Sequence, residues 1–327
     1  MTNLQTKNCL QDYFVTENGV LRLYTGKAAE VTVPVGITEI ADTAFKESYY
    51  TQTIILPQGI EELGWGTFFG CRQLKKIVLP NGLRKIGDFA FKDCENLEEM
   101  NIPLSLEKIG QNAFSGCRYL TAVSLPSGVA AVGAYAFAEC RFLADVKLNE
   151  GLKEIGEYAF CRCEDLTEIT IPESVENIND YAFRYCQSLA SVKLPQNLRK
   201  LAWCAFEGCG ALRSVKIPAV ETLGGFAFCA CSALSEVTFA EGIIKIGDSC
   251  FRDCTALAKI FLPQGLKEIG RYAFLGCGNL SEIHIPESVC EIGDKAFDGC
   301  EKLTVYGTAN SFAQRYAEAN GIAFAAE

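Results

Sequence analysis

Residues 97–117 read LEEMNIPLSLEKIGQNAFSGC, and the period of the apolar side chains changes within this stretch. Met100 and Ile102 alternate with polar residues, a pattern that predicts a short β-strand. Pro103 ends this strand, because proline has no N–H group to donate to a β ladder. The strand therefore belongs to a small unit whose pairing strands lie elsewhere in the chain.

The rest of the stretch predicts two further segments. Leu106 and Ile109 begin a second short segment, either extended or a turn, which ends at a glycine. Ala113, Phe114 and Cys117 then recur at helical spacing, which predicts one to two helical turns. A helix of that length is not stable by itself in water, so it needs neighbouring segments to pack against.

The same pattern recurs along most of the chain. A phenylalanine lies three residues before each of eleven cysteines, and Phe45 begins the series with Ser48 in the cysteine position. All ten prolines also occupy one position of the repeat. Repeats of about 20–50 residues are typical of solenoids, in which each unit buries its apolar face against its neighbours. The cysteines are spaced by 23 residues, with one step of 22: Cys71, Cys94, Cys117, Cys140, Cys163, Cys186, Cys209, Cys231, Cys254, Cys277 and Cys300.

The two ends differ from the repeats. Residues 1–33 contain an Asn-Gly pair between two alternating runs, which predicts an N-terminal cap with a β-hairpin. Residues 34–306 hold about twelve repeats. Residues 307–327 predict a C-terminal cap with a short helix, which Asn310 or Ser311 begins.

Two segments of the repeat carry a resemblance to a known family. The pattern L-x-x-I-x-I-P occurs at 166–172 and 280–286, and I-G-x-x-A-F-x-x-C occurs at 109–117 and 292–300. In these segments the chain resembles the BspA-like leucine-rich repeat proteins of bacteria. The resemblance implies an α/β leucine-rich-repeat solenoid. Such a solenoid is a curved right-handed coil with a parallel sheet on one face and short helical turns and irregular segments on the other.

Composition excludes several classes of function. The chain has a formal net charge of −10 and one histidine. A nucleic-acid-binding protein needs a basic surface, and the common zinc enzymes and Ser-His-Asp enzymes need imidazoles. No phosphate-binding glycine loop is present. We therefore expect no enzymatic activity, no catalytic residue, no cofactor, no metal site and no nucleic-acid partner.

The sequence also bears on compartment. No run of residues approaches the ~18 apolar residues of a membrane span, so we expect no membrane insertion. Residues 1–12 contain no apolar core of a signal peptide. The sequence as it stands therefore predicts a cytoplasmic protein. A leader removed from a parent protein would instead place it at the cell surface or outside the cell.

Cysteine content, 17 of 327 residues, leaves three interpretations open: a metal site, disulfides or buried thiols. The spacing favours a ladder of buried, reduced thiols at one position of each coil, because a zinc site needs four converging ligands. Reactive thiols, if any, are expected among the cysteines outside the ladder: Cys9, Cys161, Cys204, Cys229, Cys250 and Cys290.

Residues beside the inward-facing Ile and Val of each strand point out from the sheet, and they vary while the framework repeats. A constant interior with a variable face is typical of a recognition surface, although solvated sheet residues give the same pattern. We therefore predict a non-enzymatic protein–protein interaction module, a monomer with an unidentified protein partner. The candidate partner-binding residues are Lys147, Thr170, Lys193, Lys216, Phe261 and His284.

A second candidate surface is a row of aromatic residues just before the Ala-Phe pair. It supports the alternative that the protein is a cell-surface adhesin, which binds a host protein or a glycan through aromatic rows. A half-buried stack along the wall of the solenoid explains the same residues. The row comprises Phe89, Tyr135, Tyr158, Tyr181, Phe226 and Tyr272, with Trp65 and Trp203 one position earlier.

Overall fold

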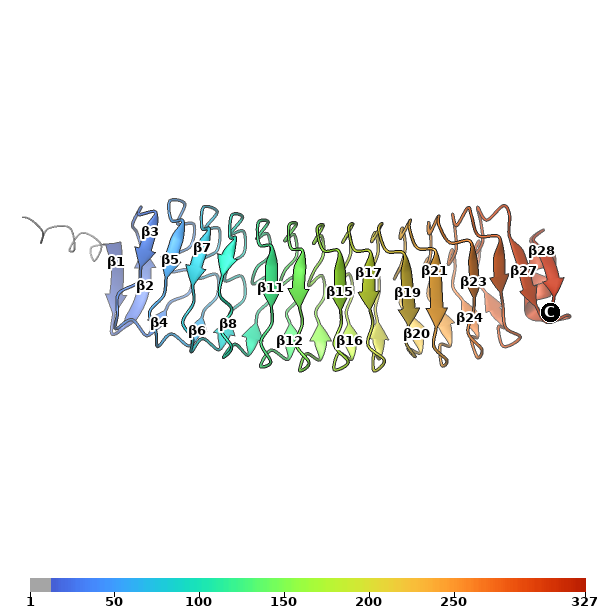
Figure 1. Ribbon diagram of the computed structural model, residues 1–327, viewed down its shortest axis with the longest axis horizontal. Helices are drawn as coiled ribbons and strands as arrows, with labels where there is room; N and C mark the ends of the chain where they lie inside the picture. Colours follow the sequence, from blue (N-terminus) through green and yellow to red (C-terminus); the bar gives the residue numbers. More distant parts are fainter. Residues whose placement is uncertain (1–12) are drawn as a thin grey trace, which may run out of the picture. The chain divides into compact units, whose positions relative to one another are not determined.

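A computed structural model describes residues 13–327, and in them each repeat forms one coil of a β-solenoid (Figure 1). The contacts within the chain divide it into two units, Met1–Leu152 and Lys153–Glu327. In each unit a coil contributes one strand to a first layer and a second strand to a second layer. Strands of the first layer precede the repeat's proline position, and strands of the second layer precede its glycine position.

The first unit begins with an antiparallel hairpin of β1 (Phe14–Glu17) and β2 (Val20–Tyr24). Its first layer contains two parallel ladders, β3-β5-β7-β9 and β11-β13. These strands are β3 (Glu30–Thr32), β5 (Thr53–Ile55), β7 (Lys76–Val78), β9 (Glu99–Met100), β11 (Ala122–Ser124) and β13 (Asp145–Lys147). In the second layer β2 is followed by β4 (Glu39–Ile40), β6 (Glu62–Leu63), β8 (Lys85–Ile86), β10 (Lys108–Ile109) and β12 (Ala131–Val132).

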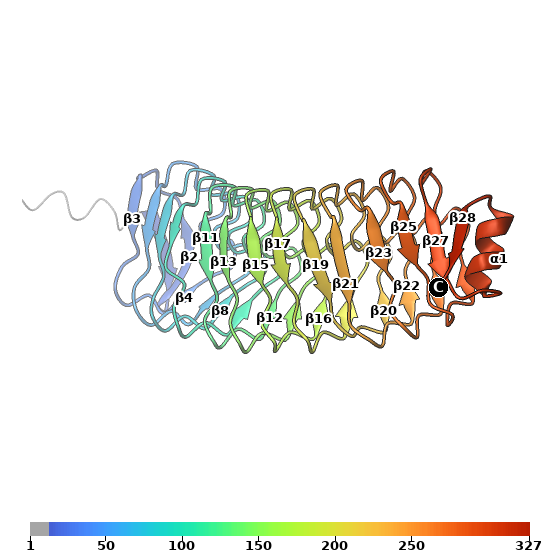
Figure 2. The ribbon, with the colours of Figure 1, turned by 45° about the vertical axis from the view of Figure 1, so that its right-hand side comes forward.

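The second unit repeats this arrangement with the ladders β15-β17-β19-β21 and β23-β25-β27-β28 in its first layer. They consist of β15 (Glu168–Thr170), β17 (Ser191–Lys193), β19 (Ser214–Ile217), β21 (Glu236–Phe239), β23 (Lys259–Phe261), β25 (Glu282–His284), β27 (Thr304–Gly307) and β28 (Ala323–Ala326). The second layer consists of β14 (Glu154–Ile155), β16 (Asn177–Ile178), β18 (Lys200–Leu201), β20 (Thr222–Leu223), β22 (Lys245–Ile246), β24 (Glu268–Ile269) and β26 (Glu291–Ile292). Helix α1 (Phe312–Ala319) joins β27 to β28 (Figure 2).

The leucine-rich-repeat solenoid expected from the sequence is confirmed, but the stretch after each glycine is not helical. It is a run of β-turns, and α1 is the one α-helix within residues 13–327. The reason lies in the backbone bonds. The N–H groups of Tyr181, Phe183 and Tyr185 donate to carbonyls of the next coil at 2.9, 2.8 and 2.7 Å. An α-helix would instead direct these N–H groups to the carbonyl four residues back.

We call this set of bonds, from alternate turn residues of one coil to the next coil, the turn ladder. The residues between them bond within the coil, as Arg184 N–H does to the Tyr181 carbonyl at 3.0 Å. Two residues of each turn have a left-handed backbone, as shown by φ values of 60° at Tyr181 and 58° at Tyr185. Non-glycine residues adopt this conformation at a cost of roughly 1–2 kcal/mol, so the bonds between coils must hold it in place.

The phenylalanine and cysteine of each repeat form the core. In the second unit Phe183 stacks between Phe160 and Phe206, with ring centroids 5.3 and 5.1 Å apart. Cys186 donates its Sγ–H to the Phe160 carbonyl of the preceding coil at 3.2 Å. Equivalent bonds are made by the ladder cysteines Cys117, Cys209, Cys254 and Cys277. The thiol therefore fills space and satisfies a carbonyl in the same position.

The ends of the described chain have the expected local structure. The β1–β2 turn has left-handed φ values of 50° at Asn18 and 79° at Gly19, as an Asn-Gly hairpin requires. Ser311 caps α1 by accepting a hydrogen bond from the Gln314 N–H at 3.3 Å. The boundaries of the two caps remain a prediction. Within residues 13–327, α1 is too short and too polar to cross a bilayer.

Replacing a stacked ring tests the core. We expect Phe183→Ala to lower the free energy of unfolding by about 3–5 kcal/mol, because it leaves a cavity between two rings. Ile244→Ala is the matched control, since Ile244 is 43% exposed and should change stability by less than about 0.5 kcal/mol. Urea denaturation followed by circular dichroism measures both, and equal effects would contradict the stacking argument.

Candidate binding surface on the first layer

The outward residues of the first layer lie in register in the second unit. Thr170 pairs with Lys193 across β15 and β17, and Lys216 pairs with Thr238 across β19 and β21. β17 and β19 are themselves paired through Ser191 and Ser214. All of these outward side chains are exposed, while the residues between them, such as Val192 and Val215, are buried. The predicted row of variable residues therefore exists as a physical surface.

Lys193 and Lys216 lie one strand apart on this surface, and among residues 13–327 neither ammonium group has a carboxylate partner. Other lysines of the first layer are neutralised locally. Lys259 forms an ion pair with Glu282, and Lys76 in the first unit forms one with Glu99 at 2.6 Å. Two uncompensated positive charges thus lie side by side on the surface of an acidic protein.

Lys147 lies in the first unit, on β13, where its Nζ is 3.3 Å from an Asp145 carboxylate oxygen. Lys193 and Lys216 belong to the second unit. A basic patch of all three lysines therefore remains a prediction, whereas the neighbouring pair in the second unit is observed.

At the C-terminal side of the second unit the outward row becomes aromatic. Phe261 is 55% exposed, and its ring stacks on that of His284 at 4.1 Å between centroids. His284 stacks in turn on Tyr306 at 4.8 Å. The three rings come from the neighbouring strands β23, β25 and β27, which are paired in register. They form a continuous stack, which we call the aromatic row of the first layer.

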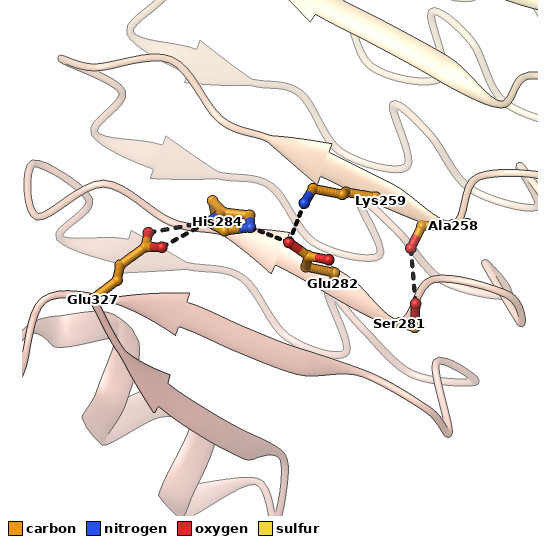
Figure 3. Close-up of polar contacts among 6 residues, drawn as sticks. All are labelled: Ala258, Lys259, Ser281, Glu282, His284 and Glu327. Carbon is orange, nitrogen blue, oxygen red and sulfur yellow. Dashed lines mark hydrogen bonds and ion pairs between the residues drawn. The ribbon is translucent and has the colours of Figure 1, made fainter.

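His284 is held by carboxylates on both edges of its ring (Figure 3). Its Nδ1 lies 2.9 Å from Glu327 Oε2, and its Nε2 lies 2.5 Å from Glu282 Oε1. Carboxylates only accept, so both contacts are hydrogen bonds only when both ring nitrogens carry protons. The imidazole therefore points outward, as expected, but both of its nitrogens are already occupied.

Glu282 is the centre of this charge cluster. The neighbouring Lys259 ammonium, and then His284, hold the pKa of the Glu282 carboxyl below its usual range. Because Lys259 also lies over the Phe261 ring, at 4.5 Å from its centroid, the cluster links the aromatic row to the charges beside it.

Two members of this cluster were missed by sequence reasoning. Tyr306 continues the row by one more coil, 22 residues after His284, and extending the repeat by one unit could have found it. Glu327 lies outside the repeat pattern, so extending the repeat does not identify it. It reaches His284 only because β28 pairs with β27 after the helix, an arrangement outside the repeat.

The second aromatic surface is partly buried. In the second unit Tyr158 stacks on Tyr181 at 4.3 Å, and Trp203 packs against Phe226 at 5.0 Å. Trp203 is 42% exposed, and in the first unit Trp65 is 47% exposed. The phenylalanines and tyrosines of the row occupy the first left-handed position of their turns. The two indoles are accessible.

The cysteines within residues 13–327 give no sign of a site. Burial raises the pKa of the Cys117 and Cys209 thiols well above the usual value, so neither is a nucleophile. Of the cysteines outside the ladder, those at 161, 204, 229 and 250 are buried and Cys290 is exposed, while Cys9 lies outside the described residues. No group of three His, Cys, Asp or Glu side chains within residues 13–327 is arranged to hold a metal ion.

Thiol labelling checks this assignment. With Cys9→Ser as background, we expect a thiol reagent to modify Cys290 quickly and the buried cysteines only after denaturation. Cys290→Ser should abolish the fast phase. A fast phase that persists in this double variant would show that one of the ladder or off-ladder thiols is accessible.

The Glu282 cluster predicts a pH dependence. A lowered folded pKa means that the ionised carboxyl adds stability at neutral pH, and that this stability is lost as pH falls through the folded pKa. We expect the carbon-13 carboxyl signal of Glu282 to titrate below the usual range of a glutamate. Lys259→Met should raise the midpoint of this titration, and an unchanged midpoint would contradict the assignment.

Comparison with known proteins agrees with this architecture. A leucine-rich repeat protein from Bacteroides ovatus is 27% identical, with a TM-score of 0.61, over 96% of this chain and 97% of its own. A leucine rich cell surface protein from Faecalibacterium prausnitzii is 28% identical, with a TM-score of 0.58, over 93% and 94%. The pneumococcal vaccine antigen PcpA is 18% identical, with a TM-score of 0.52, over 94% and 91%, and shares the fold. No curated protein matches the sequence.

The family profile for the BspA type leucine rich repeat region matches residues 23–141, 107–223 and 204–317. These overlapping matches span nearly all of the repeats, including the strands that carry the candidate surface. The chain belongs to the BspA-type leucine-rich repeat family.

Proposed function

We propose that this protein is a non-enzymatic protein-binding module, and that the first layer of its second unit binds an acidic surface of a partner protein. The observation that carries the proposal is the pair Lys193 and Lys216. They are exposed on neighbouring strands, and neither has a carboxylate partner within residues 13–327.

The surroundings of this pair suit protein recognition. Thr170 and Thr238 flank the lysines in the same row, and Ser191 and Ser214 lie in the row beside them. These short hydroxyl side chains donate and accept hydrogen bonds and lose little entropy on binding. β-strand backbones hold the side chains in fixed positions, which reduces the ordering cost of association further.

The aromatic row of Phe261, His284 and Tyr306 extends the same layer. Its exposed Phe261 provides an apolar contact of the kind that contributes most to binding energy at protein interfaces. β21 and β23 are in contact, so the lysines and the aromatic row form parts of one layer. The partner proposed here therefore has acidic groups opposite the lysines and an apolar contact opposite Phe261.

A cell-surface adhesin is the second candidate. The Faecalibacterium relative is described as a cell surface protein, and the accessible Trp65 and Trp203 are side chains on which sugars or proteins can stack. In this alternative the turns that carry the aromatic rows make the contact, and the first layer does not.

Site-specific photocrosslinking distinguishes the two. A photoreactive amino acid at Thr238 should capture the partner in the producing cells, and the same group at Lys245 in the second layer should not. The captured protein is then purified, and its affinity is measured for the double variant Lys193→Glu/Lys216→Glu. We expect a loss of at least about tenfold, or about 1.4 kcal/mol, that is larger at low salt.

Lys200→Glu/Lys245→Glu in the second layer is the matched control and should leave affinity unchanged. Both double variants are checked for native circular dichroism. Equal affinity of the native protein and the Lys193→Glu/Lys216→Glu variant would refute the lysine surface. Loss of binding in Trp203→Ala alone would favour the adhesin alternative.

A further inference from the structure

The turn ladder of the second unit ends in a row of backbone donors. In the coil before the last, the N–H groups of Tyr272, Phe274 and Gly276 donate to carbonyls of the following coil at 3.1, 2.8 and 2.9 Å. The equivalent N–H groups of the last coil belong to Lys295, Phe297 and Gly299. Within residues 13–327 these three N–H groups have no acceptor.

The last coil has the same local conformation as the coils before it. Its internal bonds are formed, since Ala296 and Asp298 donate to Gly293 and Lys295 at 3.3 and 3.2 Å. Its two left-handed positions have φ values of 53° and 78°, close to the 58° and 74° of the preceding coil. The three N–H groups therefore point away from the stack, in the direction in which every other coil of the unit finds acceptors.

The C-terminal elements close other parts of this end. β28 pairs with β27 along the first layer, and α1 lies beside them (Figure 2). The Tyr316 ring meets the Phe297 ring edge-on at 6.0 Å, so the phenylalanine stack is covered. No backbone carbonyl of α1 or β28 accepts from the three donors.

Instead, a cavity of about 610 Å³ lies between the last coil and the C-terminal elements. Lys295, Phe297 and Gly299 line one side, and Tyr316 and Ile322 line the other. Its volume is in the range of small-ligand and peptide pockets, about 300–1,000 Å³. Phe297 is only 5% exposed because its ring is buried, whereas Lys295 and Gly299 are exposed.

The chemistry of the cavity favours a neutral acceptor. Lys295 and Lys302 line it together with Asp298 and Glu301, so the side-chain charges balance. The donors are two residues apart along the chain and do not converge on one atom. A single anion would use only one of them, whereas a peptide backbone offers carbonyls at the same two-residue spacing, as each following coil does.

We propose that the open end of the turn ladder binds a peptide segment of a partner protein, whose alternate backbone carbonyls accept hydrogen bonds from Lys295, Phe297 and Gly299. The segment takes the place of the turn residues of a further coil. The surface is separate from the lysine surface of the first layer, so either site can fail without the other.

The test uses a synthetic peptide with the sequence of residues 293–299, Gly-Asp-Lys-Ala-Phe-Asp-Gly, blocked at both ends. In the structure the carbonyls of this segment accept from the coil before it. Amide hydrogen exchange is followed by NMR. In the protein without peptide we expect fast exchange at Lys295, Phe297 and Gly299 and at least 100-fold slower exchange at the equivalent residues of the preceding coil.

Saturating peptide should slow exchange of the three amides at least tenfold, and a scrambled peptide should not. Protection of the three amides before peptide is added would overturn the proposal, as would no change with peptide. An equal effect of sodium acetate or inorganic phosphate would also overturn it, because it would show an anion site.

A cavity-filling variant provides an independent check. Ala323 lines the cavity and Ala326 lies on the same strand away from it. Ala323→Trp should weaken peptide binding at least tenfold, and Ala326→Trp should not. Amide shifts of α1 show whether the end of the unit keeps its fold in each variant, and the exchange measurement on the unaltered protein stands if a variant unfolds. Full binding by a folded Ala323→Trp protein would count against the cavity as the site.

Discussion

The hydrogen bonding between coils is the constraint on which the rest of this structure depends. Strands of two to four residues cannot be stable alone, and a turn with two left-handed residues is strained. Both become stable because the neighbouring coils supply acceptors and donors to the strands and to alternate residues of the turns. In the second layer N–H groups point back along the chain, as in Gly270 to the Ile246 carbonyl, and in the turn ladder they point forward. Each coil is therefore completed by the coils on both sides.

This constraint explains the uniform interior and the varied exterior. Phe183 and Cys186 must fit the same space as their counterparts one coil away, because the rings stack at about 5 Å and the Cys186 thiol bonds a carbonyl of the coil before. The outward side chains of Lys193 and Lys216 take no part in these bonds. Such outward side chains can therefore change from lysine at 193 to phenylalanine at 261 without cost to the stack.

The strand ends and the core residues could be predicted from the sequence because each occupies a fixed position of the repeat. The proline position marks the ends of the first-layer strands, and the Phe and Cys positions mark the core. The turns were misassigned as helical because Ala113, Phe114 and Cys117 have the same spacing in a helix and in the observed run of turns. The helix and the run of turns differ in the acceptors of their N–H groups, which lie within the segment in a helix and, for alternate residues, on the next coil in the turns. The acceptor therefore depends on the neighbouring coil. The contact of Glu327 with His284 was beyond prediction because it depends on the path of α1 and β28, which the repeat does not encode.

One coil is a residue shorter than the others, between Pro218 and Leu223, and it shows how this array can change. The ring stack continues across it, with Phe206 and Phe228 at 5.6 Å, and the turn ladder is intact on both sides. Successive junctions within a unit share the bonds of the turn ladder, although the first-layer ladder is interrupted, as between β21 and β23 in the second unit. Recombination between repeats could add or remove whole coils without creating a new kind of junction. The number of coils, and with it the length of the outward surface, is then a property that evolution can adjust separately from the fold.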